Sequence, residues 1–178
     1  MTTVLKLGGS VVTAKDEPET VDRGALADAA DAVADAEDEL IIVHGGGSFG
    51  HPHAAAHGVT DTEGTHDATG IREIHDAMGE LNRAVVEALQ DRGVSALPVR
   101  PLSVASRDGD GTTTFPGEPI VTMLGEEFIP VAHGDIVVQA EEGATILSGD
   151  EIVTRLARQL DADRVGVCST VPGVLDDD

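Results

Sequence analysis

Two short glycine-rich segments are the parts of this sequence best suited to binding an anion. One reads KLGGS (residues 6–10) and the other HGGGS (residues 44–48), and each follows an apolar run directly. Glycines between a strand and a helix leave backbone N–H groups accessible, and the helix dipole adds partial positive charge there. Neither segment matches the Walker pattern or GxGxxG, so the sequence disfavours those nucleotide-binding loops. The glycines alone leave two interpretations open, a phosphate site and a tight turn.

The only lysines in the sequence, Lys6 and Lys15, both flank the first of these glycine segments. Arginine supplies the remaining cations, so the compact ammonium is used only where it can act as a point charge on a phosphate. We therefore expect Lys6 to contact a phosphate group. Lys15 lies in a polar loop, and its position is as compatible with a solvated surface lysine as with a phosphate contact.

The stretch LIIVHGGGSFGHPHAAAHG (residues 40–58) holds four of the seven histidines. The spacing His-x-His, with a third histidine four residues later, is compatible with a metal site, although no HExxH or Cys/His pattern accompanies it. An imidazole beside N–H donors can also hydrogen-bond a phosphate. We favour phosphate contact for His51, with structural and metal-binding roles as the alternatives. Ordinary structural or surface roles are expected for His53, His57, His66 and His75.

Asp150 lies in the segment LSGDE, where a predicted strand gives way to a helix. A carboxylate there can simply stabilise the helix N-terminus through the helix dipole. It can also hold a lysine, or a Mg²⁺-bound nucleotide, in line for phosphoryl transfer. Asp135, in the segment HGDI, is interpreted as a turn-forming residue. The single cysteine, Cys168, lies in the apolar segment RVGVCS and is predicted to be a buried strand thiol.

Alternating strands and helices are predicted to position these residues. Apolar runs that end in turns predict strands at residues 3–9, 39–47 and 94–99. Helical periodicity predicts helices at residues 21–36, 48–58 and 67–93, the last with Gly93 as its stop and with an apolar stripe of Ile71, Ile74, Met78, Leu81, Val85 and Leu89. We expect a hairpin or loop at residues 105–115, short β segments at 127–147, and a strand–helix–strand unit at 145–169. This alternation predicts an α/β fold, a mainly parallel sheet with helices on both faces.

The charge of the chain excludes several classes of partner. Its 178 residues carry 11 Lys and Arg against 33 Asp and Glu, a formal net charge of -22. Such a charge repels nucleic acids and anionic membranes. The hydrophobic content of 40% argues against disorder, and an acid-rich, lysine-poor surface is typical of a protein kept soluble in strong salt. No signal peptide or membrane span is recognisable, so we expect the cytoplasm of a halophile as its setting.

Six segments of the chain together resemble the amino acid kinase superfamily, and among its members the isopentenyl phosphate kinases most closely. They are VLKLGGSVVTAK, IIVHGGGSFGHP, AMGELNRAVVEAL, PVRPLS, PVAHGDIVV and ATILSGDEIVTRLARQL, spread over nearly the whole chain. The segment GGGSFGHP discriminates best, because amino-acid-phosphorylating relatives carry the glycines but generally lack the histidine. The resemblance implies a three-layer αβα sandwich, the amino acid kinase fold.

The resemblance also implies roles for the residues named above. Lys6 would neutralise the transferring phosphoryl group, and Asp150 would orient Lys6. The ATP phosphates would contact Lys6, Gly8, Gly9, Ser10 and Lys15, and the acceptor phosphate would contact Gly46, Gly47, His51 and Gly149. The implied reaction is the Mg²⁺-dependent phosphorylation of isopentenyl phosphate by ATP, in archaeal isoprenoid biosynthesis, by a homodimer. For the apolar tail we expect a wall formed by Ala54, Ala55, Ile74 and Met78.

The chain departs from the family pattern near its end. Where family members have TDVDGV this sequence reads STVPGV, and a later phosphate-binding lysine has no counterpart. We therefore expect one amino acid kinase domain over residues 1–178. Its acceptor-binding lobe would span residues 1 to about 145, and an incomplete nucleotide-binding lobe would begin at about 146. Acceptor binding should suffer less from this than ATP binding.

Three other functions remain open on the sequence alone. One is a different kinase of the same superfamily, acting on fosfomycin or on an amino acid. Another is a phosphate-binding module without catalytic activity. The third is a histidine-rich metal-binding protein, which would take up Zn²⁺ or Ni²⁺ stoichiometrically.

Overall fold

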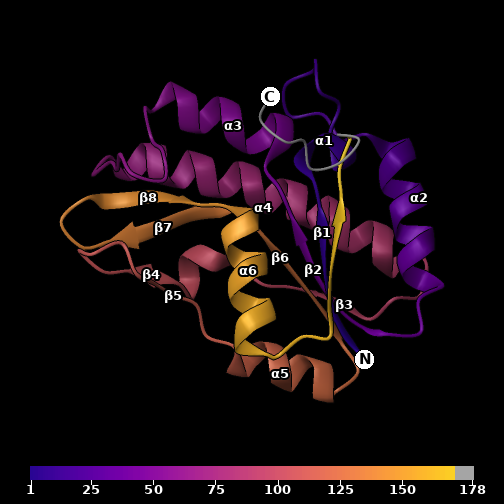
Figure 1. Cartoon of the computed structure of the whole chain (residues 1–178). Coiled ribbons are helices and arrows are strands. Elements are labelled where there is room, and N and C mark those ends of the chain that lie inside the picture. The colour runs from indigo at the N-terminus through magenta and orange to yellow at the C-terminus, as the bar shows by residue number, and fades with distance from the viewer. Residues whose placement is uncertain (171–178) are drawn as a thin grey trace, which may run out of the picture.

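Five parallel strands form the central sheet of the computed structural model, which describes residues 1–170. In spatial order they are β3 (Ala96–Pro98), β6 (Ile129–His133), β2 (Glu39–His44), β1 (Thr2–Leu7) and β9 (Arg164–Cys168). Apart from its first residue, β2 is entirely buried, as expected of a strand covered on both faces. Because all five strands are parallel, their carboxyl ends meet at one edge of the sheet, the upper edge in Figure 1.

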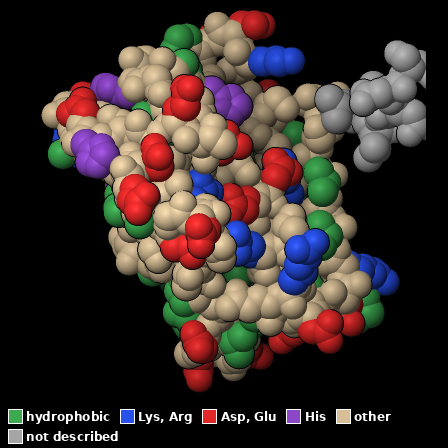
Figure 2. All heavy atoms as spheres, turned by 60° about the vertical axis from the view of Figure 1, so that its left-hand side comes forward, with side chains coloured by type: hydrophobic (Ala, Val, Ile, Leu, Met, Phe, Trp, Pro, Cys, Tyr) green, Lys and Arg blue, Asp and Glu red, His purple; other side chains and the backbone are tan. Residues whose placement is uncertain are grey.

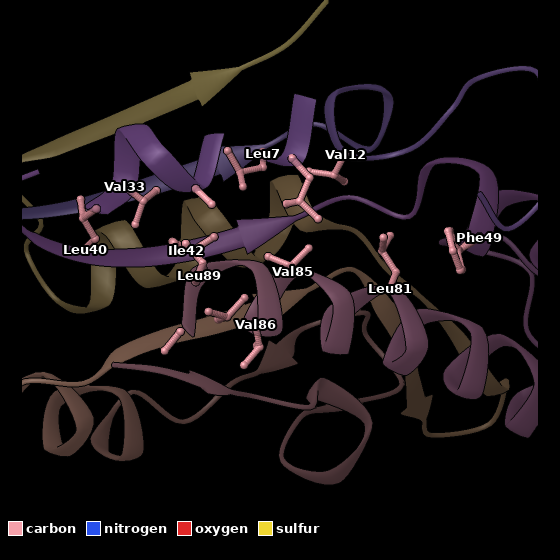
Figure 3. Close-up of a cluster of buried hydrophobic side chains, with 14 residues drawn as sticks. Leu7, Val12, Val33, Leu40, Ile42, Phe49, Leu81, Val85, Val86 and Leu89 are labelled. Atoms are coloured by element: carbon pink, nitrogen blue, oxygen red, sulfur yellow. The ribbon is translucent and has the colours of Figure 1, made fainter. Parts of the chain in front are cut away.

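Helices cover both faces of this sheet (Figure 1). One face carries α2 (Arg23–Ala34) and α4 (Ala68–Gln90), and the other carries α5 (Glu118–Gly125) and α6 (Gly149–Gln159). Along β2, Leu40 and Ile42 pack in the cluster with α2 and α4 that Figure 3 shows. Ile41 and Val43 point the other way and pack with α5 and α6. The predicted three-layer αβα sandwich is confirmed.

The longest helix, α4, forms where the apolar stripe was predicted. Asp67 caps its N-terminus by accepting a hydrogen bond from the Thr69 N–H at 2.9 Å, and Gly93, with a φ of +79°, follows its end. Every stripe residue is buried except Ile71, which is partly buried. Each fully buried Leu contributes about 1.5–3 kcal/mol. Truncating Leu81 to Ala would therefore cost about 2–5 kcal/mol.

A smaller sheet lies beside the central one, on the left in Figure 1. Its order is β5 (Thr113–Thr114), β4 (Ser106–Arg107), β7 (Asp135–Gln139) and β8 (Gly143–Leu147). β4 and β5 are antiparallel, so the hairpin alternative for residues 105–115 is confirmed. β7 and β8 form a second antiparallel pair that packs on α4 through a cluster including Ile74 and Ile136. This sheet supplies one side of the site described below.

Three shorter helices complete the described part of the chain: α1 (Gly9–Val12), α3 (Gly47–Ala56) and the 3-10 helix η1 (Pro101–Ser103). The sequence predicted α3 but neither α1 nor α5. Across residues 1–170 we find no helix with the length and apolarity that a membrane span requires.

The prediction of a buried thiol at Cys168 is wrong. Cys168 does lie in a strand, β9, but its side chain is exposed. β9 is the last strand of the described sheet and pairs only with β1 within residues 1–170, so its apolar residues are covered less than those of inner strands. Val165 and Val167 are exposed for the same reason.

Candidate functional site

The two glycine segments lie against each other at the carboxyl edge of the central sheet. β1 and β2 are neighbours, with Leu7 opposite His44, so the turns that follow them meet. A Cβ atom on Gly9 would lie 2.3 Å from the backbone nitrogen of Gly47. Gly47 itself has a φ of +48°, and its Cβ would lie 2.2 Å from Thr13 Oγ1. Glycine is therefore required at both positions by steric contact and, at Gly47, by backbone conformation.

Three backbone N–H groups beside this contact have no hydrogen-bond partner within residues 1–170. They are the N–H groups of Gly9, Gly46 and Gly47. Gly46 is the N-cap of α3 and Gly47 is its first residue, so their N–H groups are among those that a helix leaves unpaired. Donors of this kind, at the positive end of a helix dipole, bind anions readily.

A cavity of about 620 Å³ opens at this edge of the sheet. Its wall includes every residue that was predicted to contact a phosphate or to orient Lys6: Lys6, Gly8, Gly9, Ser10, Lys15, Gly46, Gly47, His51, Gly149 and Asp150. The wall also includes the apolar side chains of Ala54, Ile74, Met78 and Ile146, and a Cβ atom on Gly46 would lie 3.3 Å from the Met78 sulfur. The structure therefore brings the predicted residues together, although their individual roles remain predictions. Ala55 was expected in the apolar wall, but it is exposed and does not line the cavity.

A second, more open cavity of about 750 Å³ lies between β5 and α6. Of the predicted site residues its wall includes only Asp150. It lacks the unpaired glycine N–H groups, so we place the site in the smaller cavity.

Lys6 and Asp150 form an ion pair in the wall of the smaller cavity. The Lys6 ammonium donates to Asp150 Oδ1 at 2.5 Å. The Lys6 side chain is 16% exposed and that of Asp150 75% exposed, so the ion pair lies at the opening of the cavity. Ser148 caps α6 by accepting the Glu151 N–H at 3.1 Å, which fixes the first turn of the helix that carries Asp150.

Glu151 ties this first turn of α6 to the smaller sheet. Its carboxylate accepts hydrogen bonds from Arg107 at 2.7 Å, Thr113 at 2.5 Å and Arg155 at 3.0 Å. Burial alone would raise the pKa of Glu151, but the hydrogen bonds from Thr113 and Arg155 and the nearby guanidinium of Arg107 lower it. Basic and acidic side chains are accordingly intermixed on the face shown in Figure 2.

The three histidines after the second glycine segment have different surroundings. His51, in α3, is exposed and faces the cavity, as predicted. His53 pairs with Glu19 at 2.8 Å and His57 pairs with Glu73 at 2.9 Å. Within residues 1–170 no three His, Cys, Asp or Glu side chains are arranged to hold a metal ion. His53 and His57 are thus each paired with a glutamate on another segment of the chain.

Asp135 is not the simple turn former that the sequence predicted. It begins β7, and its side chain is completely buried. Its carboxylate accepts hydrogen bonds from His75 Nδ1 at 2.8 Å and from the Leu102 N–H at 3.3 Å. The hydrogen bond to Asp135 raises the pKa of His75 above its ordinary value, against the opposing effect of burial. The pair fixes α4 against the smaller sheet on one side of the cavity.

Two buried histidines, His44 and His133, were not predicted as site residues. Both side chains are completely buried, and their rings stack with centroids 5.5 Å apart. Each lies at the carboxyl end of a strand, directly before a glycine that lines the cavity. The signal in the sequence is the repeated His-Gly dipeptide after an apolar strand, in VHGGG and AHGDI.

Known proteins match both the sequence and the fold. The sequence profile of the amino acid kinase family matches residues 1–178. A relative from Haloferax volcanii named isopentenyl phosphate kinase is 62% identical over 177 residues, which are 98% of this chain and 71% of the relative. One of the same name from Methanocaldococcus jannaschii is 36% identical over 189 residues, covering 99% of this chain and 72% of the relative. Solved X-ray structures of isopentenyl phosphate kinase superpose with a TM-score of 0.91 at 30% identity, covering 98% of this chain and 74% of theirs. The chain belongs to the amino acid kinase family and, within it, to the isopentenyl phosphate kinases.

Proposed function

We propose that this chain transfers the γ-phosphoryl group of ATP to isopentenyl phosphate, giving ADP and isopentenyl diphosphate. The observation that carries the proposal is a cavity whose wall combines unpaired glycine N–H groups and Lys6 with small or aliphatic side chains. An acceptor that joins a phosphate to a short apolar tail matches both kinds of lining. The names of the relatives support the same substrate.

Transfer between two phosphates needs positioning and positive charge more than covalent catalysis. In the proposed reaction Lys6 balances the charge on the transferring group, and Asp150 holds the ammonium in place. The N–H of Gly9 contacts the nucleotide phosphates, with Ser10 and Lys15 beside it. The N–H of Gly8, which was also expected to donate to these phosphates, instead donates to the Cys168 carbonyl at 2.8 Å. Preorganised donors of this kind stabilise the transition state without a reorganisation cost.

The acceptor is held by the second glycine segment. The N–H groups of Gly46 and Gly47 bind its phosphate, together with His51 and with Gly149 at the start of α6. The tail lies against Ala54, Ile74 and Met78. Met78 packs so closely on α3 that a Cβ atom on Gly50 would lie 2.7 Å from its sulfur, so this wall is firm.

Mg²⁺ fits the part of the cavity that we propose to hold the nucleotide. Two exposed carboxylates, Asp16 and Asp150, line it, which suits an ion carried mainly by phosphate oxygens with few protein ligands. When bound, Mg²⁺ would neutralise charge on the nucleotide phosphates.

We extend the proposal to the organisation of the chain. Residues 1 to about 145 form the acceptor lobe, and the nucleotide lobe starts at about 146, near the first turn of α6. The segment STVPGV, at which the sequence departs from the family pattern, lies mostly outside the described residues. The resemblance to the superfamily supports a homodimer. The acidic composition supports the cytoplasm as its location.

Acceptor competition tests the proposed substrate. ADP release is followed with isopentenyl phosphate, fosfomycin and acetylglutamate, each with ATP and Mg²⁺ in molar KCl. We expect isopentenyl phosphate to give the highest kcat/KM. A higher kcat/KM for either of the other acceptors would show that the chain serves a different reaction of the same superfamily.

A further inference from the structure

His44 and His133 directly precede Gly45 and Gly134, two glycines that line the cavity. The two residues are opposite each other in the parallel pairing of β2 with β6. His44 Nδ1 lies 3.1 Å from the carbonyl oxygen of Gly45, and His133 Nδ1 lies 2.9 Å from that of Gly134. The same side-chain-to-backbone contact therefore occurs at two neighbouring strand ends.

These contacts determine which ring nitrogens carry a proton. A carbonyl oxygen can only accept, so Nδ1 of each ring must donate. His44 Nε2 is then an acceptor, and the amide nitrogen of Asn82 donates to it at 3.1 Å. Asn82 also donates to the carbonyl of Val131 at 3.2 Å, which fixes the orientation of its amide. Burial, followed by the neighbouring His133, lowers the pKa of His44 to about 3, so the ring stays neutral.

The hydrogen bond from His44 to the Gly45 carbonyl also fixes the direction of the Gly46 N–H, which belongs to the same peptide group. A trans peptide is planar, and its N–H points opposite to its C=O. Holding the Gly45 carbonyl towards the buried ring therefore turns the N–H of Gly46 the other way. That N–H makes no hydrogen bond within residues 1–170, and Gly46 lines the cavity. The groups on either side are also held, since the Gly45 N–H donates to Leu7 and the Gly46 carbonyl accepts from Phe49 and Gly50. The carbonyl of this peptide is held by His44, and between two glycines such a direct restraint matters for its orientation.

We propose that His44 is a positioning residue that aims the Gly46 N–H at the acceptor phosphate, and that His133 supports it by stacking against its ring. This inference rests on the proposed function for the identity of the acceptor. The hydrogen bond from His133 restrains the neighbouring Gly134 peptide in the same way. Gly134 in turn donates its N–H to the His44 carbonyl at 3.0 Å, so the two turns hold each other.

A packing role alone does not account for this pair. Burying two imidazoles costs free energy that an aliphatic pair would avoid. His133 Nε2 has no hydrogen-bond partner within residues 1–170 although it is buried, so that nitrogen is not the reason for a histidine there. The charged groups that influence the His133 ring, Asp135, His75 and Arg100, do not hydrogen-bond to it. The contact that each ring does make is the one from Nδ1 to a glycine carbonyl.

Two substitutions separate positioning from packing. In His44→Asn the side-chain amide nitrogen can occupy the place of Nδ1 and donate to Gly45. In His44→Gln the amide reaches the place of Nε2 and can pair with Asn82 instead. Both variants lose the ring, so we expect a similar fall in Tm. The KM for isopentenyl phosphate should rise about 10-fold in His44→Gln, the equivalent of one lost hydrogen bond, and less than 3-fold in His44→Asn. Equal KM values in the two variants would overturn the proposal.

A second measurement does not depend on which acceptor the chain uses. Inorganic phosphate is titrated into ¹⁵N-labelled protein while the Gly46 amide resonance is observed. We expect this resonance to shift in the wild type and in His44→Asn and to stay in place in His44→Gln. A shift of the same size in His44→Gln would refute the positioning role. If phosphate shifts the resonance as expected but isopentenyl phosphate is not turned over, the proposed function fails and the positioning role stands.

The tautomer itself can be observed in the resting protein. Histidine labelled with ¹⁵N should show His44 protonated at Nδ1 and unprotonated at Nε2 from about pH 8 to pH 5. A proton on Nε2 at neutral pH would remove the hydrogen bond on which the inference depends.

Discussion

The ammonium of Lys6 and the carboxylate of Asp150 lie 2.5 Å apart although 144 positions separate them in the chain. Lys6 lies one residue before the carboxyl end of β1, and Asp150 lies in the first turn of α6. The pair therefore joins the central sheet to the helix with which the proposed nucleotide lobe begins. The carboxylate keeps one oxygen free of bonds within residues 1–170. It can therefore orient the lysine and still face a nucleotide.

Replacing either partner should lower kcat to a different extent. Lys6→Met removes charge from the transferring group, and we expect kcat to fall by about 100-fold or more, with a smaller change in KM. Asp150→Asn acts through the lysine and should lower kcat by about 10-fold. Steady-state kinetics with both substrates measure these values. A change in KM alone for Lys6→Met would assign the lysine to ground-state binding instead.

His51 should matter for the acceptor rather than for the fold. Its side chain is exposed at the cavity, so His51→Ala leaves the core intact. We expect a higher KM for isopentenyl phosphate and a lower kcat, because a hydrogen bond to a charged phosphate contributes about 1.5–3 kcal/mol. His66→Ala is the matched control, since His66 is exposed and does not line the cavity. Unchanged kinetics in His51→Ala would contradict its role.

Arg107 should be essential for stability. Its buried guanidinium donates to Thr113, Thr145 and Glu151 and to two backbone carbonyls. Arg107→Met leaves buried acceptors without a donor and should cost about 3–5 kcal/mol in the free energy of unfolding.

Arg83→Met is the control for that measurement. Arg83 is exposed, and its ion pairs lie within α4, so we expect a change within about 0.5 kcal/mol. Denaturant titrations in molar KCl compare the two variants. An Arg107→Met variant as stable as Arg83→Met would show that the buried network does not stabilise the fold.

The buried histidines should make stability depend on pH. In the unfolded chain the His44 imidazole takes up a proton near pH 6.5, whereas in the folded chain its pKa is about 3. Between these values the unfolded state binds more protons, so the free energy of unfolding falls as pH drops. For His44 alone the fall is about 1 kcal/mol from pH 6.5 to pH 5.5, and the slope approaches about 1.4 kcal/mol per pH unit at lower pH. The raised pKa of His75 has the opposite effect, which acts mainly above pH 6.5 and fades as pH falls below that value.

Denaturant titrations at several pH values between about 6.5 and 5.5 measure this dependence. The His44→Asn variant has no such group and should lose a corresponding part of the slope. An identical slope in the variant would mean that His44 is not buried in its neutral form.

The parts of the fold that depend on local pattern could be predicted from the sequence. Signals of this kind are the apolar runs of β1 and β2 and the apolar stripe along α4. Each of them follows from the burial of a single segment. The hairpin and its small sheet were only partly predicted, since two-residue strands such as β4 carry almost no periodicity. α5 was missed because its eight residues begin at Glu118 and Pro119, which read as part of a turn.

The residues of the candidate site that belong to local sequence motifs could be predicted from the sequence. The glycine segments and Lys6 were expected to bind phosphate groups, and the structure places them on one cavity. The stacking of His44 on His133 and the burial of Asp135 depend on the register between β2 and β6 and on the packing of α4. Contacts between residues so far apart in the chain leave no local pattern from which to predict them. The exposure of Cys168 was missed because an edge strand and an inner strand have similar composition.

The most direct test of the proposed function is phosphorus NMR of the purified chain with ATP, Mg²⁺ and isopentenyl phosphate in molar KCl. We expect the monophosphate resonance to disappear and a pair of diphosphate doublets to grow as ADP forms. ADP formation with inorganic phosphate as the other product, and with isopentenyl phosphate unchanged, would contradict the proposed phosphoryl transfer.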